Sequence, residues 1–501
     1  GGGEERVDGE RDGVADGVDA LLSPHGRLWT EIDAVIEQNV PDHHHDSSRI
    51  NWRGVPGVEG MRSPEQYFYH LFPMTQLDSM VRASDEVLSG RGLRLTTKAE
   101  LLRWIGIRAA AALEKRRGPI HDWFEAGEVD GSLQSFGNYA IRFGMSESRF
   151  KVLTACLRLR VTPDEDVRDP WYCIRQFIEA FNELRKRVIT LGQYITVDEC
   201  MSAFKALGGN FKTTGLPHMV KIARKPEGVG AEFKSVADPC SGIIMHLEIQ
   251  EGKLPMRRKE KYEELGAGAA CTWRMTKHWH GTRRTVIGDS WFGSYKCARA
   301  LKAVGLYSQF QVKTAHREYP KKFLMNWAAE QDELRDEEGD RVPWGNWKVL
   351  KNTSNDNGTE DIYYALCHRG RKPKFLLSNK GTTLEGTPMR VERCRMGVDE
   401  DGQPFNDWYI KETPRPHMMQ TYYDHFSCID VHDHRRQGVF QMEKYWLTKC
   451  WWHRLFATVG IGMCMVDAFH LQTRWHTLSY STCIMTHQPP GVLVGKNQML
   501  R

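Results

Sequence analysis

Hydrophobic and polar residues follow two different periods along this chain, and the change of period divides it into two parts. Over residues 61–192 apolar side chains recur every three or four positions, as in 171–191, with Glu, Arg and Lys between them. This spacing is typical of amphipathic helices. Ser63 followed by Pro64, and Thr97 ahead of an apolar run, are typical helix starts. The first part is therefore predicted to be an α-helical domain.

From residue 193 the apolar residues form short runs that are bounded by Gly and Pro. Such runs are typical of strands, and they cover residues 194–197, 218–223, 232–237, 243–249, 285–287 and 306–312. Residues 295–304 have a helical pattern instead, and Gly305 follows them as it would at a helix C-terminus. A meander of strands followed by alternating helix and strand predicts a mixed α/β domain over 193–317.

Residues 318–420 interrupt this pattern. They contain a charged stretch and two further strand-like runs, 362–367 and 374–377, which predict an inserted lobe with β pairing. From 421 to 475 the helical pattern returns, and these helices are expected to complete the α/β domain. The apolar tract 455–466 is shorter than the roughly 18 residues that a membrane span requires, so we expect a core helix and no membrane partner.

The two ends of the chain lack such patterns. Residues 1–60 are expected to be largely disordered, because they begin with a run rich in Gly, Asp, Glu and Arg. Residues 476–501 are expected to be a tail. Three consecutive histidines, 43–45, suit either a polar disordered stretch or a transition-metal site. The 12 cysteines stand singly, without a C-x-x-C pair, which disfavours a structural zinc module and indicates reduced thiols.

Composition narrows the function classes. The chain has 501 residues, of which 40% are hydrophobic, enough for a substantial core in about three domains. Its net charge is only +5, so a nucleic-acid surface would have to come from local clusters of Lys and Arg. Motifs of P-loop nucleotide hydrolases, zinc proteases and serine hydrolases are absent from the sequence.

Candidate chemistry lies in three aspartates far apart in the sequence. Asp198 and Asp289 each follow a predicted strand, and Asp430 lies in a predicted helix with Asp433 one turn further on. Each could be only a turn or cap residue, a common place for Asp. Carboxylates from two strand ends and a helix are also what a two-Mg²⁺ site for phosphoryl transfer requires, because Mg²⁺ prefers oxygen ligands.

The residues around these aspartates resemble the piggyBac-like DNA transposases from about residue 64 to 475. The resemblance rests on motifs that occur in the same order as in that family. They are Asp198-Glu199 with Met201, Phe204 and Lys205; Arg224-Lys225-Pro226 with Gly230, Lys234, Asp238 and Gly242; Asp289-Ser290-Trp291-Phe292-Gly293-Ser294; Pro414, Pro416 and Tyr422; Ile429-Asp430 with Asp433; and Lys449-Cys450-Trp451-Trp452.

This resemblance implies a ribonuclease H-like core, preceded by a helical dimerisation and DNA-binding domain and interrupted by the inserted lobe. It implies Asp198, Asp289 and Asp430 as catalytic residues, with Asp433 as a further metal ligand. It also implies two Mg²⁺ ions, or Mn²⁺ in their place. The implied activity is cut-and-paste transposition of double-stranded DNA by a homodimer in the nucleus, with a hairpin intermediate and a TTAA target.

The sequence departs from the family pattern in several places. Ser290, Gly293, His434 and Asp467 replace the family's usual Asn, Thr, Gln and Asn, and no Cys/His-rich zinc module is expected in the tail. The missing module leaves an alternative open, a domesticated DNA-binding protein without catalytic activity. A third possibility, a structural protein that dimerises through its helical domain, has only the amphipathic helices in its favour.

Local basic groups are the candidates for DNA contact, since Lys and Arg clusters bind phosphates. Trp291-Phe292 and Trp451-Trp452 suit either stacking on bases or core packing. Each basic group could equally be a solvated protein surface. The predicted DNA-binding residues are Lys225, Lys234, Arg257, Arg258, Lys313, Arg317, Arg435, Arg436 and Lys449.

Overall fold

The structure is a computed structural model of the chain. It describes residues 26–32, 49–50, 63–116, 118–125, 138–161, 169–204, 215–223, 225, 227–313, 317–335, 344–354, 361–381, 383–398 and 403–473. The three histidines 43–45 and the predicted tail 476–501 lie outside these residues.

Helices form the first domain, as the periodicity predicts. They are α2 (Pro64–Leu71), α3 (Gln76–Gly90), α4 (Lys98–Leu113), α5 (Tyr139–Phe143), α6 (Glu147–Cys156) and α7 (Tyr172–Val188). Ser63 and Gln66 form a capping box at the start of α2, and the Thr97 hydroxyl accepts the Glu100 N–H at the start of α4. Capping satisfies N–H groups that lack partners inside a helix, so these starts are fixed locally.

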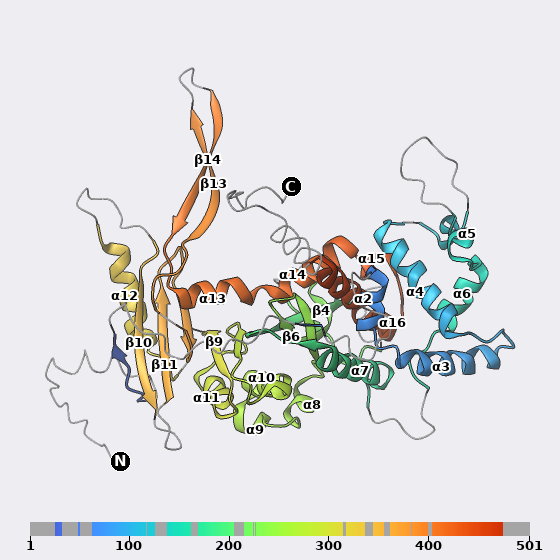
Figure 1. Cartoon of the computed structure of the whole chain (residues 1–501), viewed down its shortest axis with the longest axis horizontal. Coiled ribbons are helices and arrows are strands. Elements are labelled where there is room, and N and C mark those ends of the chain that lie inside the picture. Colours follow the sequence, from blue (N-terminus) through green and yellow to red (C-terminus); the bar gives the residue numbers. More distant parts are fainter. Residues whose placement is uncertain are drawn as a thin grey trace, which may run out of the picture.

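Five strands form the centre of one large sheet, in the spatial order β7-β6-β4-β8-β9 (Figure 1). Their bounds are β4 Tyr194–Ala203, β6 Val229–Asp238, β7 Ile243–Ile249, β8 Thr285–Gly288 and β9 Tyr307–Gln311. The β4, β6 and β7 strands are antiparallel, whereas β8 pairs in parallel with both β4 and β9. This mixed sheet confirms the predicted α/β class and agrees with a ribonuclease H-like core.

Two of the predicted strand limits are wrong. The β4 strand does not end before Asp198 but continues to Ala203, because its whole second half pairs with β6. The run predicted over 218–223 forms only the short β5 (Val220–Lys221). Both differences arise from pairing with a strand far away in the sequence, which local patterns do not reveal.

Helices cover both faces of this sheet. Between β7 and β8 lie α8 (Lys253–Arg257), α9 (Tyr262–Leu265) and α10 (Ala267–Thr276), and α11 (Tyr295–Ala303) joins β8 to β9. The α10 helix packs on β6 and β7, whereas α13 (His417–Phe426) and α14 (Cys428–His434) pack on β4. In Figure 1, α10 and α11 lie below the sheet and α13 and α14 above it.

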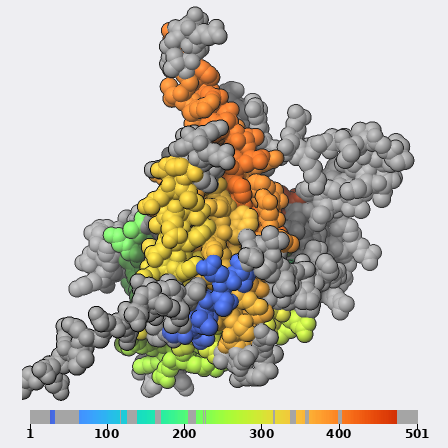
Figure 2. Space-filling model, turned by 90° about the vertical axis from the view of Figure 1, so that its left-hand side faces the viewer, coloured from blue at the N-terminus to red at the C-terminus, as the bar shows by residue number. Residues whose placement is uncertain are grey.

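The predicted inserted lobe is continuous with the core sheet. After α12 (Lys321–Glu333), strands β10 (Trp347–Ser354), β11 (Asp361–His368) and β12 (Lys374–Ser378) extend the sheet from β9. Only β13 (Met389–Val398) and β14 (Pro404–Thr413) form a separate hairpin, which projects from the molecule in Figure 1 and Figure 2.

Part of the region expected to be largely disordered is ordered. Thr30 and Glu31 form β1, which pairs with β10 at the outer edge of the sheet, and Figure 2 shows residues 26–32 in blue against this edge. Trp29 beside them is fully buried against Tyr295 and Tyr319. A second short pair joins β2 (Arg49–Ile50) to β3 (Ile189–Thr190). Burial of this large aromatic, together with the pairing of β1 and β10, holds residues 26–32 in place.

The C-terminal helices connect the helical domain to the sheet. A π-helical stretch (Arg435–Phe440) and α15 (Met442–Tyr445) lead to α16 (Trp451–Phe456) and a second π-helical stretch (Ala457–Met463). Aromatic contacts tie them to the first domain: Trp104 meets Trp446 with ring centroids 5.1 Å apart, and Trp171 meets Trp451 at 5.6 Å. One hydrophobic core therefore spans both domains.

Of the described residues, one helix is long and apolar enough to cross a membrane. It runs over Trp451–Thr473, with a mean hydropathy of 1.4 in an 18-residue window, but 83% of that window is buried inside the protein. Burial of this kind is expected of the core helix that the sequence predicts.

Candidate active site

Three carboxylates from two neighbouring strands converge at the centre of the sheet. Asp198 lies midway along β4, and Asp289 directly follows β8. The parallel register pairs Val197 with Gly288, so the next residues, Asp198 and Asp289, are brought side by side. Gly288 allows this approach, because a Cβ there would lie 2.6 Å from the Val197 side chain.

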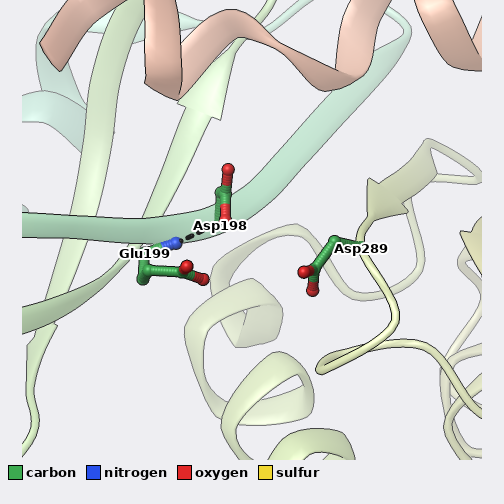
Figure 3. Close-up of side chains that lie close together, drawn as sticks. All are labelled: Asp198, Glu199 and Asp289. Carbon is green, nitrogen blue, oxygen red and sulfur yellow. Dashed lines mark hydrogen bonds between the residues drawn. The ribbon is translucent and has the colours of Figure 1, made fainter. Parts of the chain in front are cut away.

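Glu199 joins these two aspartates, as Figure 3 shows. One carboxylate oxygen from each of Asp198, Glu199 and Asp289 lies within 4.8 Å of the others. Within the part of the chain that the structure describes, no other group of three His, Cys, Asp or Glu residues meets this criterion. The sequence motif contains Glu199, but it was not among the predicted ligands, since successive strand residues normally face opposite sides of a sheet.

Burial gives this cluster its electrostatic character. Asp198 is 7% exposed and Glu199 is 3% exposed. Burial of Asp198, followed by the negative charges of Glu199 and Asp430, raises the pKa of Asp198 to about 9. Buried carboxylates that repel one another are stabilised by a cation, and a set of oxygen donors suits a hard divalent ion. The residues present therefore fit a Mg²⁺ or Mn²⁺ site.

The turn after β8 holds Asp289 in place. Its Oδ1 accepts the Trp291 N–H at 2.8 Å, and its carbonyl accepts the N–H groups of Phe292 and Gly293. Asp289 therefore has two roles. Its Oδ1 stabilises the turn, and its second carboxylate oxygen takes no part in that turn. The Trp291 carbonyl lies so close to α10 that a Cβ on Gly268 would be 2.2 Å from it, so this glycine is required.

Asp430 and Asp433 lie in α14, above β4, but in different environments. The Asp430 side chain is 51% exposed, and its Oδ1 is 3.5 Å from the Lys225 ammonium. Asp433 is buried, and its Oδ1 accepts from Arg436 at 2.9 Å. The structure thus brings Asp430 close enough to act electrostatically on Asp198, whereas Asp433 already has a cationic partner.

A buried polar network fixes α14 relative to the rest of the protein. Asp467 is fully buried and accepts from Arg185 of α7 at 2.8 Å, from His432 of α14 at 3.1 Å and from the Ile244 N–H of β7 at 3.1 Å. Burial opposes ionisation of Asp467, but the hydrogen bond from His432 and the Arg185 charge outweigh it and lower the pKa. The sequence pointed to Asp467 only as a departure from the family pattern.

Tyr422 of α13 lies near enough to Asp289 and Asp198 for their charges to act on it. It is buried and its ring stacks on Phe426 with centroids 5.0 Å apart. Burial and the carboxylates of Asp289 and Asp198 raise the pKa of Tyr422 well above its usual range, so the phenol stays protonated beside the cluster.

Two of the predicted DNA-binding residues, Lys234 and Arg436, are buried in the structure. Lys234 is 3% exposed, pairs with Glu232 at 2.6 Å and packs on the Trp291 ring. Arg436 is fully buried and donates to Asp433 and to the Met201 carbonyl. Both cations are paired with carboxylates inside the protein, which disfavours their predicted role in DNA contact.

The other predicted DNA-binding residues lie nearer the surface. Exposed side chains are those of Arg257, Arg258, Lys313, Arg317 and Lys449, while Arg435 and Lys225 are half-buried. The two aromatic pairs are mainly packed: Phe292 and Trp451 are buried, which favours their role in the core.

Comparison with known proteins agrees with this architecture. A family model described as "Transposase IS4" matches residues 63–469, which is most of the chain. The chain belongs to the Transposase IS4 family. No curated protein matches it closely enough to be counted as a relative.

A solved structure shares the fold of this transposase. The cryo-EM structure of a piggyBac transposase synaptic complex with hairpin DNA matches with a TM-score of 0.60 and 17% sequence identity, covering 87% of this chain and 79% of the piggyBac chain. The piggyBac-like resemblance inferred from the motifs is therefore confirmed at the level of the fold.

Proposed function

We propose that this protein is a cut-and-paste DNA transposase that uses its buried carboxylate cluster to cleave and rejoin DNA at transposon ends. The observation that carries the proposal is the convergence of Asp198, Glu199 and Asp289 within 4.8 Å, with Asp430 on the helix above. Membership of a transposase family and the similarity of the fold to a piggyBac transposase support a role of this cluster in cleaving DNA phosphodiesters.

In this proposal Asp198, Glu199 and Asp289 would hold divalent cations, Mg²⁺ or Mn²⁺, and Asp430 would complete the site. When bound, a pair of such ions polarises the scissile phosphate and lowers the pKa of the attacking water. The sheet holds Asp198 and Asp289 rigidly, and the buried Asp467 network orients the helix that bears Asp430. The predicted metal ligand Asp433 acts instead mainly through its bond to Arg436, by which α14 is tied to the β4 backbone.

The reaction has two kinds of step. Water first attacks a phosphodiester at the transposon end and releases a 3′-hydroxyl. That hydroxyl then attacks the opposite strand and later the target DNA, which we propose to be TTAA. The protein would act as a homodimer on paired double-stranded ends, and in a eukaryotic host it would act in the nucleus. Exposed Arg257, Arg258, Lys313 and Lys449 would bind phosphates along the DNA.

An excision assay tests this function. A reporter is interrupted by a DNA segment with the inverted repeats that flank this gene, bounded by TTAA, and precise repair is scored. The wild type should excise, whereas a variant with Asp198→Asn, Asp289→Asn and Asp430→Asn should not. The matched control is Asp424→Asn, which replaces an exposed carboxylate on α13 and should excise normally.

The same assay separates the domesticated alternative. Specific binding to the repeats without excision by the wild type, at any Mg²⁺ or Mn²⁺ concentration, would indicate a DNA-binding protein that has lost its chemistry. Excision by the triple variant would contradict the proposed site. Excision that survives replacement of both TTAA sequences would contradict the target proposal alone.

A further inference from the structure

Lys225 links the strand and the helix that contribute to the candidate active site. It lies between β5 and β6, and its side chain is only 12% exposed. Its ammonium donates to the Glu199 carbonyl of β4 at 2.5 Å and lies 3.5 Å from Asp430 Oδ1 of α14. The Lys225 side chain therefore bridges β4 and α14, the two elements whose carboxylates would together hold the metal ions.

Acidic side chains surround the Lys225 ammonium. Those of Asp433, Asp198, Glu199 and Asp430 lie near enough to act on it. Asp433 has Arg436 as a closer partner, so Lys225 is the cation placed to neutralise Asp430. The ammonium therefore lies beside the one carboxylate, Asp430, that would complete a divalent-cation site with the Asp198, Glu199 and Asp289 cluster.

A lysine ammonium and a divalent cation compete for the same carboxylate oxygen. Mg²⁺ and Mn²⁺ bind oxygens at short range and carry twice the charge of an ammonium, so a bound ion would displace the Lys225 ammonium, which lies 3.5 Å from Asp430 Oδ1. Lysine suits such an exchange, since it is a compact point charge on a flexible four-carbon stem. The released ammonium would remain within reach of any phosphate bound between β4 and α14.

We propose that Lys225 is an exchangeable counter-ion of the active site: it neutralises Asp430 in the metal-free protein and transfers to the DNA phosphate when divalent metal binds. The inference rests on the proposed function and adds to it. A lysine that only contacted DNA would leave metal binding unchanged, whereas an exchangeable counter-ion opposes metal binding and assists catalysis.

Mn²⁺ binding to the DNA-free protein tests this directly. Mn²⁺ is titrated into the wild type and into Lys225→Met, and binding is followed by calorimetry or electron paramagnetic resonance. The control is Lys221→Met, which replaces an exposed lysine of β5. Removing a competing unit charge a few ångström away should tighten Mn²⁺ binding by roughly three- to tenfold in Lys225→Met. The same variant should excise at least roughly tenfold more slowly, and Lys221→Met should match the wild type in both assays.

A second variant guards against a simple loss of structure. Lys225→Gln keeps a donor for the Glu199 carbonyl but removes the charge, so it should also bind Mn²⁺ more tightly. Thermal unfolding of each variant in EDTA shows whether the protein is still folded.

The outcomes separate three roles. If the Lys225 variants bind Mn²⁺ like the wild type but bind DNA more weakly, Lys225 is only a phosphate contact. If they bind Mn²⁺ more weakly, Lys225 is a structural tether. Either result would overturn the proposed exchange. If the wild type binds no Mn²⁺, or if Asp198→Asn binds it equally well, the proposed active site itself fails.

Discussion

Replacing Asp198 with Asn should stabilise the metal-free protein while abolishing its activity. The ordinary pKa of this carboxyl is 3.8, and in the folded protein it is about 9. At pH 7 the folded protein therefore keeps Asp198 protonated, whereas the unfolded chain ionises it. About three pH units separate 3.8 from 7, and each is equivalent to about 1.4 kcal/mol, so folding loses up to about 4 kcal/mol at this site.

Asparagine removes this cost because it is neutral and nearly the same shape. Its amide oxygen can still accept the Glu199 N–H that Asp198 Oδ1 accepts at 2.8 Å. The expected gain in the free energy of unfolding is about 2 kcal/mol at pH 5 and up to about 4 kcal/mol at pH 7. The sign follows from the raised pKa: the wild type loses stability as the pH rises from about 4 towards 9, and the variant lacks this loss.

Urea unfolding in EDTA at pH 5 and pH 7 measures the difference between wild type and variant. Asp424→Asn removes an exposed carboxylate 3.4 Å from Arg415 and should change stability by less than about 1 kcal/mol. Adding Mg²⁺ should then stabilise the wild type by mass action but not Asp198→Asn. The reasoning is refuted if the variant is less stable than the wild type in EDTA, or if the difference is the same at both pH values.

Three further changes test other parts of the structure. Asp467→Ala leaves the Arg185 guanidinium buried without its counter-charge, and urea unfolding should show a loss of about 3–5 kcal/mol. Gly268→Ala places a Cβ 2.2 Å from the Trp291 carbonyl, which shifts the turn after β8 and should slow excision roughly 10–100-fold while end binding persists. Arg257→Ala should lower the slope of log K against log salt for DNA binding by about 1, with stability changed by less than about 0.5 kcal/mol.

Different results would contradict each of these in turn. Stability within about 1 kcal/mol of wild type for Asp467→Ala would mean that the buried pair contributes little. Normal excision by Gly268→Ala would show that the turn adapts without moving Asp289. An unchanged salt slope for Arg257→Ala would remove that side chain from the DNA surface.

Local features of this fold could be predicted from the sequence because neighbouring residues decide them. The helix starts at Ser63 and Thr97 depend on side chains that accept N–H groups within the same turn. The helix at 295–304 ends before Gly305, whose φ of 73° is a conformation that glycine adopts without strain. The strand predicted over 243–249 is β7 with the same limits.

The candidate site was partly visible in the sequence as well. Asp198 and Asp289 are predicted as residues that each follow a strand, and the parallel register of β4 and β8 brings them together. Glu199 was not predicted, because strand alternation alone places it on the face opposite Asp198. In the folded protein one of its carboxylate oxygens nevertheless lies within 4.8 Å of an oxygen of each aspartate.

Tertiary structure alone decided the environment of each charge. Lys234 and Arg436 look like surface cations in the sequence, yet both are buried beside carboxylates. The strands of the inserted lobe look like a separate unit, yet they extend the core sheet by pairing with β9. The sequence by itself determined which residues could form helices, strands and a carboxylate site, since these depend on local preferences. Strand partners and burial depend on contacts between residues far apart in the chain, and only the folded protein brings those together.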